Sequence, residues 1–465
     1  MALKRVAVSV LFLSFLFSDQ QTLKGQLLEQ AVLTAPDAGP GDWFGFAIAE
    51  DSNFMVVTAY LDDDKGSNSA CDSGAAYIYQ GSVHSGWVFL KKIYASDGYC
   101  GQKFGVTVAL LGDVLVVGAD LTHLSPGAAT AGAVYVYYKD EGGVANWGEK
   151  KKIVASDSMA GAQFGGAIAL TGERLAVAAA QHASLCPGGA QCAHGAVYVF
   201  ERNGGGVDNW GEVKKIIPTD VAQYDYFGTS VALEGDRLAV GSSGDDSGCA
   251  PINPTCDAGA VYVFERNHGG IGMWGQTAEL LADDGRYGGR SGWALDLEGT
   301  RLAATAVFGD GAASNSGVAR IWEQNELGVW DWSTTMWPTS GTTQAWFGTA
   351  IALEQNRVYV GARFAAGGAP NTGAAYLFLR GVDGAWSESS TLQASDGQDG
   401  DYFGAAIEST ANGLLIGARQ DDGACPTNPE CNSGSVYVFD FSLLSDGFEP
   451  GDACAWSAAV GGGCP

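Results

Sequence analysis

The hydrophobic pattern of this chain consists of short apolar runs that return at a regular interval. Runs of about four to six residues, rich in Val, Tyr, Ile and Phe, are bounded by Gly, Asn and Asp. Residues 106–110, 115–118 and 132–137 form one such series, and a fourth run lies within residues 147–157. Short runs with this punctuation predict β-strands joined by hairpins rather than helices.

A Phe-Gly pair begins each round of the pattern, and successive pairs lie 56 to 64 residues apart. Four runs per round at this period are typical of one blade of a propeller. We therefore predict an all-β fold, a seven-bladed β-propeller with four antiparallel strands per blade. The pairs, interpreted as structural signatures, are Phe44-Gly45, Phe104-Gly105, Phe164-Gly165, Phe227-Gly228, Phe347-Gly348 and Phe403-Gly404. A degenerate seventh copy keeps Gly292 but has Ser291 in place of Phe.

The two ends of the repeat array complement each other. Residues 27–37 resemble a fourth strand, although they precede the first Phe-Gly pair. The seventh repeat ends after its third strand, residues 434–439. We expect the N-terminal strand to complete the last blade and close the ring, because this pairs two edges that would otherwise be open.

The segments outside the repeats predict export. Residues 1–18 have a basic start and an apolar run, as in a secretory signal peptide, with cleavage expected between residues 18 and 25. The apolar run is too short to span a bilayer, and no other stretch approaches that length. Residues 26–440 form the predicted propeller, and residues 441–465 form a C-terminal tail with an expected disulfide. We expect the protein to be secreted or at the cell surface.

At these signatures the sequence resembles the FG-GAP repeat family, the propellers of integrin α-chain heads and of many secreted bacterial proteins. The Phe-Gly pairs, residues 115–119 and 358–362, and the third-strand pattern of residues 132–137 carry the resemblance together. It implies a seven-bladed propeller with a binding or adhesion role. The calcium sites of integrin-like members are not expected here, because the turns between first and second strands are short and poor in oxygen ligands.

Acidic residues gather in the loops between second and third strands: Asp62, Asp63, Asp64, Asp245, Asp246, Asp310, Asp421 and Asp422. Hard carboxylate oxygens suit calcium, so these are candidate ligand- or cation-binding loops. Asp and Gly are also ordinary residues of solvated turns, and the bidentate Glu that closes a calcium loop is missing. We favour the turn interpretation and expect no cofactor, with calcium as the alternative.

Ten cysteines occupy the same loops and the tail. Four pairs are close in sequence and are predicted disulfides: Cys186 with Cys192, Cys249 with Cys256, Cys425 with Cys431, and Cys454 with Cys464. Cys71 and Cys100 remain, one in a loop and one in a link between blades. Both connections emerge on the same face of a propeller, so we predict a disulfide between them. A rival metal site of His182, Cys186, Cys192 and His194 lacks zinc-finger spacing, and an oxidising compartment favours the disulfide.

Composition and missing motifs narrow the function. The chain has 25 Lys+Arg against 52 Asp+Glu, a net charge of −27. Nucleic-acid partners are excluded, because they require cationic side chains against phosphates. No G-x-S-x-G, H-E-x-x-H or phosphate loop occurs, so we expect no enzyme activity. A Trp recurs in six repeats and is interpreted as structural: Trp87, Trp147, Trp210, Trp274, Trp330 and Trp386.

We therefore predict a non-catalytic, exported binding or adhesion-type propeller, monomeric, that holds a protein or glycan ligand on its long-loop face. One alternative is a secreted polysaccharide hydrolase or lyase that uses loop carboxylates near the central channel. Another alternative is a structural component of the cell surface.

Overall fold

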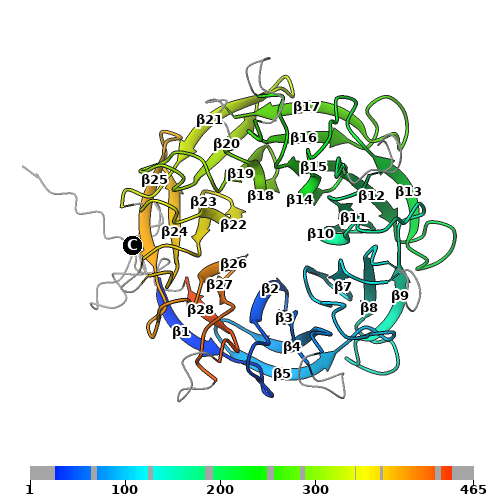
Figure 1. Ribbon diagram of the computed structural model, residues 1–465, viewed down its shortest axis with the longest axis vertical. Helices are drawn as coiled ribbons and strands as arrows, with labels where there is room; N and C mark the ends of the chain where they lie inside the picture. Colours follow the sequence, from blue (N-terminus) through cyan, green and yellow to red (C-terminus); the bar gives the residue numbers. More distant parts are fainter. Residues whose placement is uncertain are drawn as a thin grey trace, which may run out of the picture.

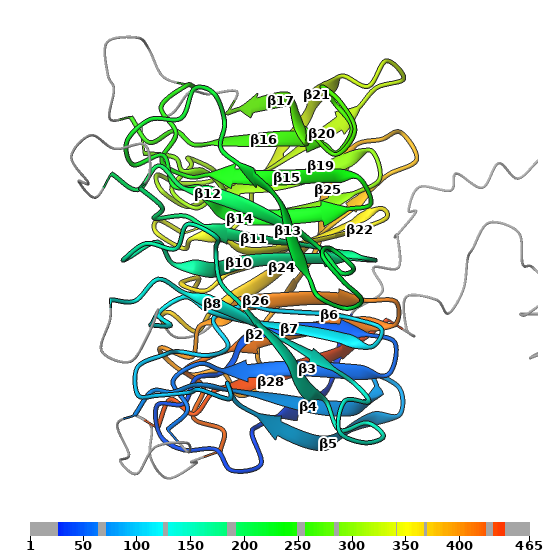
Figure 2. The ribbon, with the colours of Figure 1, turned by 90° about the vertical axis from the view of Figure 1, so that its right-hand side faces the viewer.

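The computed structural model describes residues 27–63, 71–123, 129–183, 192–248, 256–282, 288–340, 342–366, 370–424 and 431–441. In these residues, 28 strands form seven four-stranded antiparallel sheets arranged as the blades of a ring (Figure 1). The strands run along the axis of the ring (Figure 2). The predicted seven-bladed β-propeller is confirmed. Among the described residues, no helix is long and apolar enough to cross a membrane.

The blades repeat one strand order from the channel outwards. The first strands are β2 (Phe44–Asp51), β6 (Val108–Leu111), β10 (Phe164–Thr171), β14 (Phe227–Glu234), β18 (Ser291–Glu298), β22 (Phe347–Glu354) and β26 (Phe403–Thr410). The second strands are β3 (Phe54–Ala59), β7 (Val114–Ala119), β11 (Arg174–Ala179), β15 (Arg237–Ser242), β19 (Arg301–Ala306), β23 (Arg357–Ala362) and β27 (Gly413–Ala418). The third strands are β4 (Ala75–Ser82), β8 (Ala133–Tyr138), β12 (Ala196–Glu201), β16 (Ala260–Glu265), β20 (Val318–Gln324), β24 (Ala374–Arg380) and β28 (Ser435–Asp440). The outer strands are β5 (Gly86–Ile93), β9 (Gly148–Ile153), β13 (Gly211–Ile216), β17 (Gly275–Leu281), β21 (Trp330–Met336), β25 (Trp386–Leu392) and β1 (Leu28–Leu33).

The Phe-Gly signatures form the seams between blades. Phe164, at the start of β10, donates its backbone N–H to the carbonyl of Ala131 in the preceding blade, over 2.9 Å. Gly132 follows Ala131 with a φ of +93°, and a Cβ on it would lie 2.0 Å from the carbonyl oxygen of Phe164. Equivalent backbone bonds join all seven blades. The glycine before the third strand is therefore required by close approach of the next blade.

Each signature Phe also fills the core of its own blade. The Phe164 ring is buried and packs edge-on against Tyr198 of β12, with ring centroids 5.4 Å apart. In the fifth blade, Ser291 and Arg320 replace this aromatic pair, and both are buried. Ser291 still donates its backbone N–H across the seam, over 2.8 Å. The degenerate copy thus loses the ring pair and keeps the seam.

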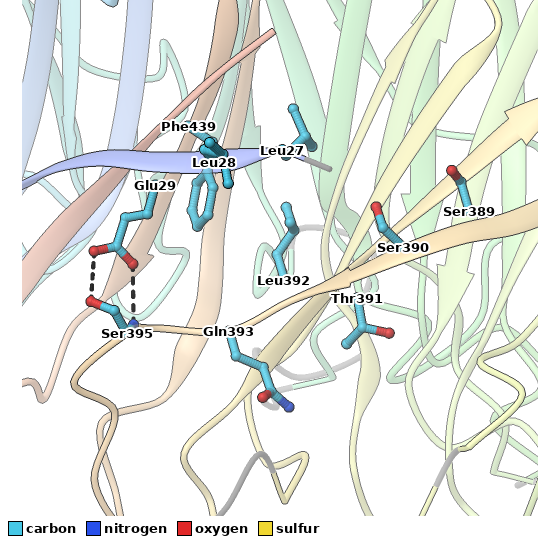
Figure 3. A pocket seen from close by; sticks show the side chains of 10 residues that line it. All are labelled: Leu27, Leu28, Glu29, Ser389, Ser390, Thr391, Leu392, Gln393, Ser395 and Phe439. Atoms are coloured by element: carbon cyan, nitrogen blue, oxygen red, sulfur yellow. Dashed lines mark hydrogen bonds between the residues drawn. The ribbon is translucent and has the colours of Figure 1, made fainter. Parts of the chain in front are cut away.

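The ring closes with the N-terminal strand, as predicted. Strand β1 pairs antiparallel with β28 and completes the seventh blade. Beside β25, the carboxylate of Glu29 accepts hydrogen bonds from the Ser395 hydroxyl at 2.7 Å and the Ser395 backbone N–H at 3.1 Å (Figure 3). Glu212 makes the same clamp to Ser156 between internal blades. The closing seam therefore repeats an internal contact. A hollow of about 410 Å³ lies beside it and is lined by Leu28 among others.

Candidate binding face

The connections between second and third strands meet the inter-blade links on one face, here called the loop face. In the first blade, the predicted Cys71–Cys100 disulfide joins the two kinds of connection. Gly101 also donates its backbone N–H to the Cys71 carbonyl over 2.6 Å. The loop face is therefore cross-linked to the ring rather than loosely attached.

The first carboxylate of each acidic pair is buried beneath this face. Asp62 and Asp245 are 1% and 2% exposed, and each accepts a 2.6 Å hydrogen bond from a third-strand tyrosine, Tyr77 and Tyr262 respectively. Burial and the adjacent carboxylate raise the pKa of both tyrosine hydroxyls. Asp421 is buried in the same way and bonds to a tyrosine. These carboxylates anchor the loops to the core, so they are not exposed turn residues.

The second carboxylate of each pair binds backbone amides at the far end of its own loop. Asp63 Oδ1 accepts from Asp72 N at 2.8 Å, and Asp246 and Asp422 make equivalent bonds. Asp310, which is not part of a pair but occupies the same register, accepts from Asn315 N at 2.9 Å. Each pair thus braces one loop. No cluster of three or more His, Cys, Asp or Glu suited to a metal is found in the described residues. Asp64 lies outside them, and the calcium hypothesis stays a prediction.

The rival metal site around His182 does not use its described cysteine as a ligand. Cys192 is disulfide-bonded, as are Cys256 and Cys431, and no described cysteine is free. His182 is fully buried, and burial lowers its pKa to about 4. A fully buried, neutral histidine whose ring lies 5.6 Å from that of His194 and 6.1 Å from that of Tyr198 is a structural core residue.

The other predicted disulfides reach beyond the described part of the chain. Cys186, Cys249 and Cys425, the predicted partners in the three loops, lie outside the described residues. Both cysteines of the tail, Cys454 and Cys464, lie outside them as well. These four pairings therefore stay predictions, whereas the Cys71–Cys100 pairing is confirmed.

The repeated tryptophans also belong to the core. Trp147 and Trp210 are at most 1% exposed, and Trp274 and Trp330 are buried as well. Trp147 packs edge-on against Phe54 of the preceding blade at 5.4 Å. The structural interpretation is confirmed for these four residues, whose rings have no free face for a ligand.

One side chain from each blade lies near the mouth of the central channel on the loop face. The residue before each Phe-Gly pair, or before Ser291-Gly292, has a left-handed φ between 54° and 60° in all seven blades. These residues are Trp43, Lys103, Gln163, Tyr226, Arg290, Trp346 and Tyr402. All are partly exposed. The repeat thus provides seven geometrically equivalent positions that carry different side chains.

In blades five, six, seven and one, these positions and their neighbours form a continuous surface, here called the aromatic arc. Its aromatic members are Trp43, Phe46, Tyr60, Trp293, Phe308, Trp346, Phe364 and Tyr402, and its cations are Lys103, Arg290, Arg363 and Arg419. The Phe364 ring lies 4.7 Å from Trp346 and 5.0 Å from Tyr402. Arg419 lies over both Tyr402 and Trp43, at 5.9 and 5.0 Å. The contacts join four blades without a break.

The matching region of blades two, three and four, here called the plain arc, has smaller side chains. Val106, Gly166 and Thr229 follow the signature glycines where blades five and one carry Trp293 and Phe46. A hollow of about 310 Å³ lies over this arc and reaches Tyr226. The two arcs have the same backbone conformation at these positions and differ in their side chains.

Two carboxylates in the channel wall were also missed by the sequence reasoning. Asp296 and Glu408 occupy a first-strand position where the other five blades have alanine. Leu353 N donates to Asp296 Oδ2 over 2.8 Å, and Glu50 N donates to Glu408 Oε1 over 3.3 Å. Burial raises the pKa of Asp296 to about 6 and that of Glu408 to about 8. Aligning the seven repeats of this chain with one another would have revealed both residues, because each is an acid at a position that is otherwise alanine.

A family model describes most of this architecture. The FG-GAP repeat matches residues 27–79, 87–137, 147–200, 210–264, 330–378 and 386–439, more than half of the chain. The chain belongs to the FG-GAP repeat family. Each FG-GAP match begins at or next to the outer strand of one blade and ends in the third strand of the next. The interval without a match contains Ser291-Gly292, the degenerate copy. No curated protein matches the chain.

Proposed function

We propose that this FG-GAP propeller is a non-catalytic binding or adhesion-type module that holds a ligand outside the cell on its loop face. The observation that carries the proposal is the aromatic arc, a continuous, partly exposed set of rings on one face of a rigid ring. Aromatic side chains give large contact areas with little entropy to lose, and they are enriched in binding surfaces. The Cys71–Cys100 disulfide supports an oxidising, extracytoplasmic location.

The contacts of the loop carboxylates support binding over catalysis. A polysaccharide hydrolase or lyase would need Asp62, Asp245 or Asp421 free to reach a substrate. All three are buried and accept hydrogen bonds from tyrosines of their own blades. Breaking these contacts would cost the loops their anchors.

The test compares two tyrosines at one repeat position. Tyr402 in the aromatic arc and Tyr226 in the plain arc have φ values of 60° and 54°, so replacement by alanine strains both backbones alike. Wild type, Tyr402→Ala and Tyr226→Ala would be titrated onto fixed cell surfaces and a glycan array. We expect Tyr402→Ala to lose about tenfold in affinity and Tyr226→Ala to keep wild-type affinity. Equal binding by the two variants, or release of reducing ends from a polysaccharide by the wild type, would refute the proposal.

A further inference from the structure

Arg363 and Arg419, at the centre of the aromatic arc, lack the carboxylate partners that many arginines of this chain have. Arg237, for example, pairs with Glu265 at 2.7 Å, and Arg380 pairs with Glu323 at 2.9 Å. Within the described residues, neither Arg363 nor Arg419 forms an ion pair, and the Nε atom of each is buried without a hydrogen-bond partner. Two neighbouring cations without an anion are unusual in a chain with a net charge of −27.

Both arginines are partly buried among the aromatic rings of the arc. Burial and proximity to Arg419 lower the pKa of Arg363 to about 10, and burial lowers that of Arg419. Arg363 lies over the rings of Trp346 and Phe364, at 4.6 and 4.9 Å. Stacking on rings orients a guanidinium but leaves its planar N–H groups available to a carboxylate. The centre of the arc is therefore prepared for an anion.

A hollow of about 450 Å³ is lined by Trp346 and Phe364, the two rings on which Arg363 stacks, and has the composition of a sugar site. Its walls include the rings of Phe308, Trp346 and Phe364. Its polar lining consists of neutral amides and hydroxyls, from Asn315, Thr343, Gln344 and Asn371. Aromatic faces pack against the C–H faces of pyranose rings, and amides and hydroxyls pair with their hydroxyl groups. The volume falls in the range of ordinary ligand sites.

We propose that the aromatic arc binds a polysaccharide that carries carboxylate groups, with a sugar ring against Trp346 and a carboxylate on Arg363 and Arg419. This inference rests on the binding function proposed above and names its ligand class. The length of the arc, over four blades, suits several consecutive sugars. The lining of the hollow, which among the described residues has neutral amides and hydroxyls and no cation, favours sugar hydroxyls over the regularly spaced phosphates of a nucleic-acid strand.

The test is calorimetric titration of the full chain with oligogalacturonate and with the same oligosaccharide after reduction of its carboxyl groups. We expect saturable binding that weakens with salt, and at least about tenfold weaker binding of the reduced form. Trp346→Ala and Arg363→Gln should each lose about tenfold in affinity, while Tyr226→Ala in the plain arc binds like wild type. Cooperative thermal unfolding of each variant would show that it is folded.

The outcomes separate this proposal from the binding function. Absence of binding to oligogalacturonate, alginate and hyaluronate would refute the ligand class, as would equal affinity for the reduced oligosaccharide. Saturable binding of single-stranded DNA or of an acidic peptide, lost in Trp346→Ala, would refute the sugar assignment and leave the arc as a binding surface. Binding of oligogalacturonate that neither Trp346→Ala nor Arg363→Gln weakens would refute the site.

Discussion

The aromatic arc and the plain arc show how one backbone carries two different surfaces. In both arcs the residue before the Phe-Gly pair, or before Ser291-Gly292, has nearly the same left-handed φ. The same backbone hydrogen bond also joins neighbouring blades in both. The aromatic arc places Trp346 and Tyr402 at these positions, whereas the plain arc places Gln163 and Tyr226 there, and Lys103 lies where the two arcs meet. The difference lies in side chains alone. The ring fixes positions, and the choice of residue at each position sets what a region of the face can bind.

The largest effect is expected where the arcs are identical, at the seams. Gly132→Ala in the plain arc and Gly373→Ala in the aromatic arc would each place a Cβ 2.0 Å from a carbonyl oxygen of the next blade. We expect each to lower the free energy of unfolding by about 2–4 kcal/mol, measured by urea denaturation. The control Gly172→Ala, with nothing within 4 Å of its Cβ, should lose only the cost of its positive φ. A seam substitution tolerated in one arc would show that the arcs have different scaffolds.

The next effect concerns Glu408 in the channel wall of blade seven, at a position where blades two, three and four of the plain arc all have alanine, as do blades one and six. Its pKa of about 8 in the folded state, against an ordinary 4.5, is raised by burial, with Asp296 and Glu50 adding repulsion. Between about pH 4.5 and pH 8 the folded state keeps a proton that the unfolded state releases, so stability falls as the pH rises. We expect Glu408→Gln to remove this slope. The free energy of unfolding of the variant, relative to that of wild type, should be on the order of 1–3 kcal/mol higher at pH 8 than at pH 4.5. The exposed Glu326→Gln is the control, and a parallel pH profile of Glu408→Gln and wild type would contradict the expectation.

A smaller effect is expected from the arginines of the aromatic arc. Arg363 forms no ion pair among the described residues, whereas Arg290 lies near the Asp257 carboxyl, whose pKa is raised by burial and partly held down by Arg290. Arg363→Met should therefore raise the free energy of unfolding by about 1 kcal/mol, because an uncompensated charge leaves a partly buried site. Arg290→Met, the matched control, should not stabilise the protein. A loss of stability in Arg363→Met would mean that its stacking on Trp346 outweighs desolvation.

The smallest effect concerns the closing seam between blades six and seven, two of the blades that carry the aromatic arc. Glu29→Ala removes two hydrogen bonds to Ser395, and Glu212→Ala removes the same two to Ser156 between blades two and three, which carry the plain arc. Each should cost about 0.5–1 kcal/mol. Only Glu29→Ala should speed amide exchange along an outer strand, because the strand order places β1 far in sequence from the rest of its blade. Equal exchange rates in β1 and β13 would show that closure adds no weak point.

The sequence predicts the fold well, because each blade repeats the same local signals. Phe104-Gly105 and residues 132–137 mark the two sides of a seam, and their glycines are explained by close backbone contact. The Cys71–Cys100 disulfide follows from blade topology once the cysteines that are close in sequence have been paired. Even the degenerate fifth blade is placed correctly, since Gly292 keeps its register.

The candidate site is harder to predict, because it depends on exposure and on contacts between repeats. Asp62 looks like a turn residue until Tyr77, on another strand, buries and binds it. The aromatic arc combines residues before the signature pair, such as Trp346, with residues after the second strand, such as Phe364. Neither of these two positions is aromatic in every blade. A search for residues that recur in all repeats therefore does not find the aromatic arc.

The offset between the FG-GAP matches and the blades has a consequence for how such rings change size. One match, residues 87–137, contains both ends of the 2.7 Å hydrogen bond from the Tyr135 hydroxyl to Asp97, which spans two blades. A tandem duplication or deletion of one such unit would carry its joint with it. The last blade would still have three strands of its own and would still receive β1 as its fourth strand. The number of blades could therefore change by whole units without leaving an unpaired strand edge.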